Sequence, residues 1–144
     1  MFTVLYVDDD PALLDIAKIF LELSGRIRVE TVQSAGEAID LARCRKYDGI
    51  ISDYEMPGIN GVEFLRHIRQ HYPDLPFILF TGRGREEIAI EALNSGADFY
   101  LQKGGEPKAQ FAELEYNLMH ALHKRPGGTD PREPWQLLSR RMVR

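Results

Sequence analysis

Short apolar runs alternate with longer segments of helical period along most of this chain. Five runs have the length and composition of strands, and they cover residues 2–7, 27–32, 48–52, 77–80 and 98–101. The runs around Ile50 and Ile78 lack polar alternation, as expected for strands that helices cover on both faces. Strands and helices in alternation are typical of a parallel sheet built from repeated strand-helix units. The pattern therefore predicts an α/β fold.

The first predicted helix has a clear start signal. Asp10 is placed to cap it, and Pro11 stands in the first turn, where a missing N–H is harmless. The face predicted to be buried consists of Leu13, Ile16, Ala17 and Phe20. The fourth helix is expected to stop near Ser95 and Gly96, because glycine tolerates the left-handed conformation that ends many helices.

A breaker-rich stretch ends the regular pattern. Residues 126–131 read Pro-Gly-Gly-Thr-Asp-Pro, which continues neither a helix nor a strand. We expect one domain over residues 1–125, and we interpret residues 126–144 as a linker or an appended tail. The apolar cluster around Trp135 is too short to form a domain of its own.

Composition narrows the class of protein. The chain has 144 residues, of which 44% are hydrophobic and 28% are charged, as in globular domains. A net charge of −4 argues against a nucleic-acid partner. No apolar run approaches the roughly 20 residues that span a bilayer, and no secretion signal is visible, so no membrane association is expected. The single cysteine, Cys44, excludes an internal disulfide, which favours a cytoplasmic setting. Cys44 itself is expected to be a small, partly buried residue.

Polar residues with distinct chemistry follow four of the five predicted strands. Asp8 and Asp9 follow the first strand, Asp53 the third, Thr81 the fourth and Lys103 the fifth. Ligands of open parallel sheets bind outside the carboxyl ends of the strands. If the first and third strands are neighbours, their clustered carboxylates require a cation, and oxygen ligands open to water suit Mg²⁺. A carboxylate beside Mg²⁺ indicates phosphoryl chemistry, with Asp53 as a nucleophile.

These residues belong to a set of motifs that resembles the receiver domain of response regulators. The resemblance covers about residues 2–124, and it depends on the order and spacing of the motifs together. The motifs are Val7-Asp8-Asp9-Asp10-Pro11, Ser52-Asp53-Tyr54-Glu55-Met56-Pro57-Gly58, Asn60-Gly61, Phe80-Thr81-Gly82 and Gly96-Ala97-Asp98-Phe99-Tyr100-Leu101-Gln102-Lys103. The runs around Thr81 and Lys103 are similar to receivers of archaeal sensory proteins, which are often joined to sensor or kinase modules.

The resemblance implies a role for each matching position. Asp53 would be the phosphoacceptor, and Asp8, Asp9 and the backbone carbonyl of Glu55 would hold Mg²⁺ with it. Thr81 would contact the phosphoryl group and Lys103 would pair with it. Tyr100 would be the aromatic residue that moves inward on activation, although a static, half-buried tyrosine remains an equal alternative. Glu55 and Arg83 would tune the rate of hydrolysis.

The fold and function that follow are specific. We expect a doubly wound, flavodoxin-like three-layer sandwich with five parallel strands in the order 2-1-3-4-5. The chain would accept a phosphoryl group from a histidine kinase or a small phosphodonor and would change the surface of its fourth helix, fifth strand and fifth helix. It would not be a conventional enzyme, since it catalyses only its own phosphorylation and dephosphorylation. A downstream sensor, kinase or effector module would respond, and the chain would be a monomer or a weak homodimer.

One position departs from the receiver pattern. Receivers commonly have proline after the lysine, with a cis peptide before it, whereas Gly104 and Gly105 follow Lys103 here. A cis bond to a residue other than proline costs roughly 3 kcal/mol or more. This cost favours a trans Lys103–Gly104 bond, with Lys103 held differently than in receivers that have the proline.

Alternative interpretations accompany these expectations. Asp10 is favoured as a helix cap over a metal ligand, and the histidines at positions 67 and 71 as a solvated face over a metal site without a third ligand. A phosphatase with an aspartate nucleophile would use Asp8, but it leaves Asp53 without a role. A pseudo-receiver, a binding module that does not switch by phosphate, is disfavoured by the complete pocket.

Overall fold

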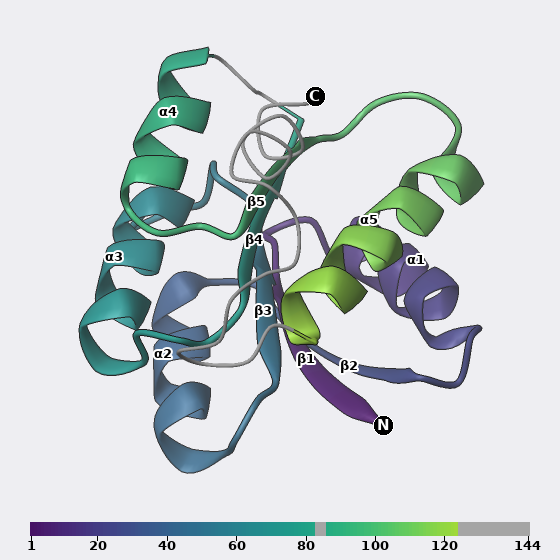
Figure 1. Ribbon diagram of the computed structural model, residues 1–144, viewed down its shortest axis with the longest axis horizontal. Helices are drawn as coiled ribbons and strands as arrows, with labels where there is room; N and C mark the ends of the chain where they lie inside the picture. The colour runs from purple at the N-terminus through teal and green to yellow at the C-terminus, as the bar shows by residue number, and fades with distance from the viewer. Residues whose placement is uncertain (83–85, 124–144) are drawn as a thin grey trace.

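The computed structural model describes residues 1–82 and 86–123, and Figure 1 shows strands alternating with helices along this part of the chain. The strands are β1 (Phe2–Val7), β2 (Ile27–Val32), β3 (Gly49–Ser52), β4 (Phe77–Thr81) and β5 (Phe99–Gln102). The helices are α1 (Pro11–Glu22), α2 (Ala35–Cys44), α3 (Gly61–His71), α4 (Glu86–Asn94) and α5 (Pro107–Leu122).

The five strands form one parallel sheet in the order β2-β1-β3-β4-β5, which confirms the predicted topology. The strand order reverses at β1, which lies between β2 and β3. In register, Val7 pairs with Val32 on one side and with Ser52 on the other. The residues that directly follow β1 and β3 therefore emerge side by side at the carboxyl edge of the sheet.

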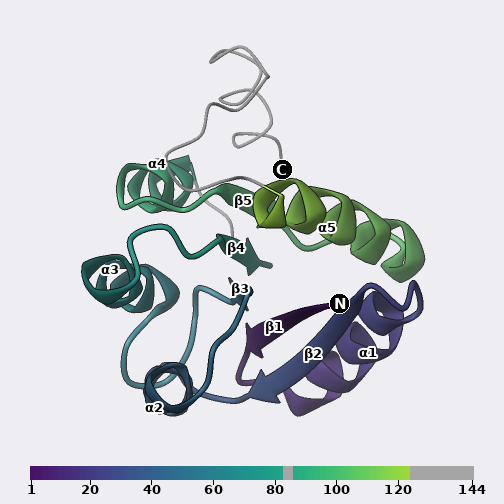
Figure 2. The ribbon, with the colours of Figure 1, turned by 60° about the horizontal axis from the view of Figure 1, so that its bottom comes forward.

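Helices cover both faces of the sheet, so the domain has three layers. In Figures 1 and 2, α1 and α5 lie on one face, and α2, α3 and α4 lie on the other. Each face has its own apolar core, and alternate residues of the central strands contribute to the two cores: Leu5 and Val7 of β1 face one core, and Val4 and Tyr6 face the other. Because both faces are covered, these strands are continuously apolar, as the sequence pattern indicated.

The predicted strand boundaries are correct for β1 and β2 and shift by one residue elsewhere. β3 begins at Gly49 instead of Asp48, β4 extends to Thr81, and β5 covers Phe99–Gln102. Asp98 lies just before β5, where its N–H donates to the carbonyl oxygen of Phe77 and its carboxylate accepts the N–H of Phe77, each over 2.8 Å.

The predicted buried face of α1 was wrong in part. Leu14, Ala17 and Leu21 are buried, whereas Ile16 is 44% exposed. Leu13 and Phe20 are only partly buried against the core. The helix carries apolar side chains on more than one face, so several stripes of helical period fit its sequence and the period alone does not select one. The start was predicted correctly, since the Asp10 carboxylate accepts the N–H groups of Ala12 and Leu13.

Arg69 joins the loop before β4 to the loop before β5 through one part-buried network. Its guanidinium donates to the carbonyl oxygens of Gly96, Tyr72 and Leu75 and lies 3.3 Å from the Asp98 carboxylate. The end of α4 is as predicted, because Gly96 adopts a φ of +104°. These contacts connect the end of α3 to the starts of β4 and β5, the two strands whose far ends reach the polar pocket described below.

Other expectations have mixed outcomes. Cys44 is exposed, not partly buried as predicted, because it lies in the last turn of α2. None of the helices within the described ranges has the length and apolar character needed to cross a bilayer. The predicted domain end at Arg125, the tail 126–144 and Arg83 lie outside the described residues; α5 ends at Leu122.

Candidate functional site

The carboxyl ends of β1, β3 and β4 and the loop after β5 surround one polar pocket. Its volume is about 410 Å³. It is lined by Asp8, Asp9, Asp10, Leu13, Asp53, Glu55, Thr81, Gly82 and Lys103. The topology explains this assembly, because the strands are parallel and all their carboxyl ends meet at one edge. The strand-end residues selected from the sequence therefore lie together.

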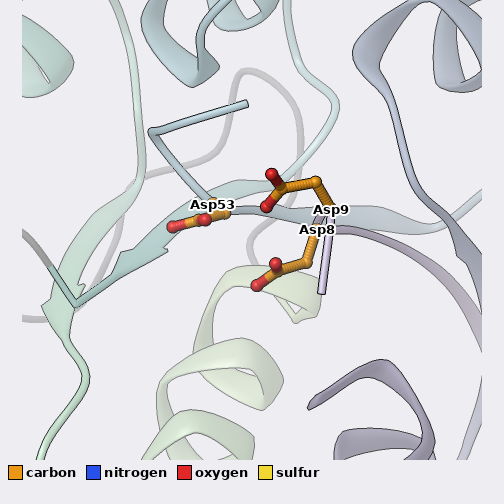
Figure 3. Close-up of side chains that lie close together, drawn as sticks. All are labelled: Asp8, Asp9 and Asp53. Atoms are coloured by element: carbon orange, nitrogen blue, oxygen red, sulfur yellow. The ribbon is translucent and has the colours of Figure 1, made fainter. Parts of the chain in front are cut away.

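Three aspartates form the acidic part of the pocket. Figure 3 shows Asp8 and Asp9 at the end of β1 beside Asp53 at the end of β3. One carboxylate oxygen from each lies within 4.8 Å of the others, and this is the one such group of potential metal ligands found within residues 1–82 and 86–123. Asp8 and Asp53 are buried and Asp9 is exposed. Carboxylates this close, one of them facing water, fit the few protein ligands and retained waters of Mg²⁺.

Lys103 supplies the positive charge of the pocket. Its ammonium lies 2.7 Å from an Asp8 carboxylate oxygen and 3.5 Å from Asp53 Oδ1. The ammonium also lies 5.7 Å from the centre of the Phe80 ring, within range of a cation–π interaction. No cis peptide bond occurs in the described part of the chain, so the Lys103–Gly104 bond is trans, and the side chain nevertheless reaches the carboxylates.

Opposing influences act on the Asp53 carboxylate. Burial raises its pKa above the ordinary aspartate value, and the neighbouring Asp8 charge raises it further. The Lys103 ammonium and hydrogen bonds from the Thr81 hydroxyl and the Tyr54 backbone N–H lower the pKa in part. The net effect is a raised pKa, which means that the ionised form of Asp53 lowers the stability of the folded protein. A cation bound in the pocket would offset this loss.

The remaining pocket residues take distinct positions. Thr81 is buried at the end of β4, and its hydroxyl hydrogen-bonds to Asp53. The Asp10 carboxylate caps α1, and the Asp10 N–H donates to Asp8 Oδ1 over 3.0 Å. Asp10 thus serves as the predicted cap and also orients Asp8. Glu55 lines the pocket and is exposed.

Comparison with known proteins identifies the family. The family model of the response regulator receiver domain matches residues 4–115, which include every pocket residue described above. The chain belongs to this family. The receiver domain is the phosphoacceptor switch of two-component response regulators, and this chain is accordingly a signalling protein.

Curated relatives of this receiver domain are response regulators. It is 41% identical over 101 residues to the C4-dicarboxylate transport transcriptional regulatory protein DctD of Pseudomonas aeruginosa, a match that covers 69% of this chain and 21% of the relative. It is 38% identical over 127 residues to the response regulator protein FleR of the same species, covering 88% of this chain and 26% of FleR. The receiver domain thus spans about a quarter or less of the length of these two relatives.

Solved structures agree with this assignment. The receiver domain of the Francisella response regulator 1452 superposes with a TM-score of 0.76 at 29% identity, covering 85% of this chain and 97% of that one. A CheY-like receiver domain protein from Methanospirillum hungatei superposes with a TM-score of 0.74 at 30% identity, covering 84% and 96%. The fold of this receiver domain is therefore shared over nearly the whole length of these structures.

The aromatic residue of β5 is inside the receiver domain. Tyr100 is 3% exposed and packs in the core under α3 and α4. Its hydroxyl is buried without a hydrogen-bond partner, and burial raises the pKa of its phenol. The side chain is more deeply buried than the half-buried tyrosine considered from the sequence, and whether it moves or is static stays a prediction. A buried hydroxyl without a hydrogen-bond partner lowers the stability of the folded state.

Gly61 is a residue of the site whose importance the sequence analysis did not derive. Its N–H donates to the Tyr54 carbonyl oxygen over 2.7 Å. A Cβ at this position would lie against the Asp53 carbonyl oxygen and 2.8 Å from Leu79 Cδ1. Glycine is therefore required for α3 to start this close to the proposed acceptor. Its position directly after Asn60, which caps α3, was the one sequence signal for this role. A glycine there indicates that the start of α3 packs closely against the loop that carries Asp53.

The histidine pair of α3 stays apart from the pocket chemistry. The rings of His67 and His71 stack with their centres 4.6 Å apart. They belong to no group of three potential metal ligands in the residues that the structure covers. The interpretation of this pair as a solvated face stays a prediction.

Proposed function

We propose that Asp53 accepts the phosphoryl group and that Asp8, Asp9 and the backbone carbonyl of Glu55 hold a Mg²⁺ ion with it. One observation carries the proposal: three carboxylates lie within 4.8 Å of one another, and a lysine ammonium lies 3.5 Å from one of them. Bound Mg²⁺ would supply charge neutralisation for the phosphoryl oxygens. The family assignment and the acidic pocket support this role.

The chain's own residues divide the remaining chemistry. An Asp53 carboxylate oxygen attacks phosphorus, the acyl phosphate bond forms, and the bond between phosphorus and the donor's leaving group breaks. A carboxylate carries no proton that must be removed, so Asp53 in its ionised form needs no general base for this step. The Lys103 ammonium and the Thr81 hydroxyl both lie beside Asp53, where they would donate to phosphoryl oxygens.

The switch would act through Thr81 and Tyr100. Movement of the Thr81 hydroxyl from the Asp53 carboxylate to the phosphoryl group would pull the end of β4 toward the pocket. Tyr100 pairs with Leu79 of β4, so it is adjacent to that movement. We propose that phosphorylation shifts an existing equilibrium by favouring one position of Tyr100 and so changes the surface formed by α4, β5 and α5.

The partners and setting follow from the proposed chemistry. The donor would be a histidine kinase or a small phosphodonor, and the readout would belong to a sensor, kinase or effector module, in the same full-length protein or a separate one. The curated relatives, which are longer than this chain, support such an arrangement. We further propose a cytoplasmic protein, similar to receivers of archaeal sensory proteins, that is a monomer or weak homodimer and catalyses only its own phosphorylation and dephosphorylation. Residues 126–144 would be a linker or an appended tail.

Mass spectrometry after incubation with acetyl phosphate and Mg²⁺ tests the proposal. We expect one phosphoryl label, on Asp53, and none when EDTA replaces Mg²⁺ or when Asp53→Asn is used. A label on Asp8 would identify the alternative phosphatase chemistry. Absence of any label, together with partner binding that phosphodonors do not change, would identify a pseudo-receiver.

A further inference from the structure

The turn that follows Lys103 has unusual backbone freedom. Gly104 adopts a φ of +150° and Gly105 a φ of +88°, conformations that residues with side chains rarely take. Two such glycines leave the chain poorly constrained directly after the lysine. The Lys103 ammonium nevertheless lies 2.7 Å from Asp8 and 3.5 Å from Asp53. Hydrogen bonds from outside the turn hold the backbone around Lys103.

The Gln110 side chain bridges the two residues that flank Lys103. Its amide Nε2 donates to the carbonyl oxygen of Gly104 over 2.8 Å and to that of Gln102 over 3.4 Å. The Lys103 N–H donates to the carbonyl oxygen of Thr81 over 2.9 Å. The backbone of Lys103 is thus held to β4 by its own N–H and to α5 through the carbonyl groups on either side of it.

Gln110 lies in the first turn of α5, whose N-terminus is capped. The Glu106 carboxylate accepts the N–H groups of Lys108 and Ala109, each over 3.0 Å, and Pro107 occupies the first turn. The Gln110 N–H donates to the carbonyl oxygen of Glu106 over 3.0 Å. A side-chain amide fixed in the first turn of a capped helix is a suitable anchor for a flexible glycine turn.

We propose that Gln110 is a positioning residue that holds Lys103 in the pocket, in place of a rigid residue after the lysine. The proposal depends on the phosphoryl-transfer role proposed for Lys103. Gln110 touches no reacting atom, and its effect passes through the peptide groups on both sides of Lys103. Loss of the amide donors would let the glycine turn relax and would spread the ammonium over more positions.

The first experiment compares rates of Asp53 labelling by acetyl phosphate with Mg²⁺ for the whole chain and its variants. Gln110→Met keeps the length of the side chain and its preference for a helix but removes the donors. We expect labelling about threefold to tenfold slower, the loss corresponding to one hydrogen bond. Gln110→Arg keeps N–H donors and is expected to stay within about twofold of the original rate. Gln70→Met, at an exposed position of α3, is the matched control and should leave the rate unchanged.

The second experiment places Gln110→Met in a Lys103→Ala background. A residue that acts through Lys103 should have no further effect once the ammonium is gone, so the ratio of rates should fall to about one. A persisting threefold or larger loss in that background would overturn the positioning role and show a general effect on the fold. An unchanged rate for Gln110→Met alone would also overturn it.

Urea unfolding of each variant keeps the two proposals separable. A Gln110→Met protein that is folded under assay conditions but labelled slowly, and is restored by Gln110→Arg, supports the positioning role. Equal losses in the methionine and arginine variants would overturn it. If the original chain took no label at Asp53, the proposed function itself would be wrong. If the original chain is labelled at a rate that Gln110→Met does not change, only the positioning role of Gln110 is wrong.

Discussion

Lys103 donates its short, 2.7 Å hydrogen bond to Asp8 and lies farther, 3.5 Å, from Asp53, the residue proposed to be phosphorylated. The lysine thus neutralises a carboxylate that is also a proposed Mg²⁺ ligand. A metal ion bound to Asp8 would replace the ammonium as the partner of this carboxylate. The ammonium could then pair with a phosphoryl group on Asp53. The same lysine would in this way compete with the metal before phosphorylation and cooperate with it afterwards.

Lys103→Met should therefore bind Mg²⁺ more tightly while being phosphorylated more slowly. Removal of a positive charge beside the metal ligands should lower the Mg²⁺ dissociation constant roughly threefold to tenfold, more at low salt than at high salt. Titration of tyrosine fluorescence with Mg²⁺ measures the affinity, and labelling of Asp53 by acetyl phosphate measures the rate. Weaker Mg²⁺ binding by the variant would show that Lys103 supports the metal site in the free protein.

Asp53→Asn should stabilise the metal-free protein. Burial raises the pKa of Asp53, so the folded state takes up its proton at a higher pH than the unfolded state does. The free energy of unfolding therefore falls as the pH rises from the unfolded-state pKa of Asp53 to its folded-state pKa. Above the folded-state pKa the whole loss of stability is present. Asparagine removes that cost, so its urea midpoint in EDTA should exceed that of the original chain at about pH 7.

The difference between these two proteins should shrink as the pH is lowered through the pKa of Asp53, because the original chain then becomes neutral at this position. Saturating Mg²⁺ should narrow the gap as well, since it stabilises the protein that binds it. A less stable Asp53→Asn protein at neutral pH would mean that the contacts with Lys103 and Thr81 outweigh burial.

The parallel sheet was predictable from the alternation of apolar and helical segments, and the acidic pocket from the residue types at the strand ends. Continuous apolar strands indicated two covered faces, and a parallel sheet brought all the strand ends to one edge. The strand order expected for a receiver then placed β1 beside β3, and so Asp8 beside Asp53. These inferences need order and spacing but no detailed packing.

Three features could not be predicted from the sequence. The inward face of α1 was ambiguous because Ile16 and Leu14 lie on competing stripes of the same helix. The restraint on Lys103 comes from Gln110, seven residues later, and a glutamine in a first helical turn has no distinctive sequence signal. The burial of Tyr100 depends on how α4 packs on β5, which residue type alone does not fix.

Arg69→Met should destabilise the fold more than an ordinary surface substitution. The guanidinium holds four acceptors in two loops, and its removal would leave the Asp98 carboxylate and several carbonyl groups with fewer partners. We expect a loss of about 2 to 4 kcal/mol in the free energy of unfolding, measured by urea denaturation.

Arg66→Met is the control on the same helix. Its ion pair with Glu91 is exposed, with 54% and 50% of the two side chains accessible. Exposed pairs contribute about 0.5 kcal/mol or less, so this variant should be close to the original protein. Equal losses at the two positions would mean that the Arg69 network is no stronger than a surface contact.

Gly61→Ala and Gly36→Ala should have opposite effects on stability, although each places one methyl group on a helix. At Gly61 the methyl group would meet the Asp53 carbonyl oxygen and the Leu79 side chain, so α3 and the loop that carries Asp53 would have to separate. We expect a loss of about 2 to 3 kcal/mol in the free energy of unfolding.

The same displacement should reach the chemistry, because Asp53 follows β3 directly and shares its backbone with the crowded carbonyl group. Asp53 labelling in Gly61→Ala should slow even in the fraction that is folded. Gly36 lies in α2 with no atom within 4 Å of an added Cβ, and alanine there should stabilise the protein by about 0.5 to 1 kcal/mol through helix preference. Urea denaturation of both variants measures the sign directly, and stabilisation by Gly61→Ala would contradict the close approach of α3 to the acceptor loop.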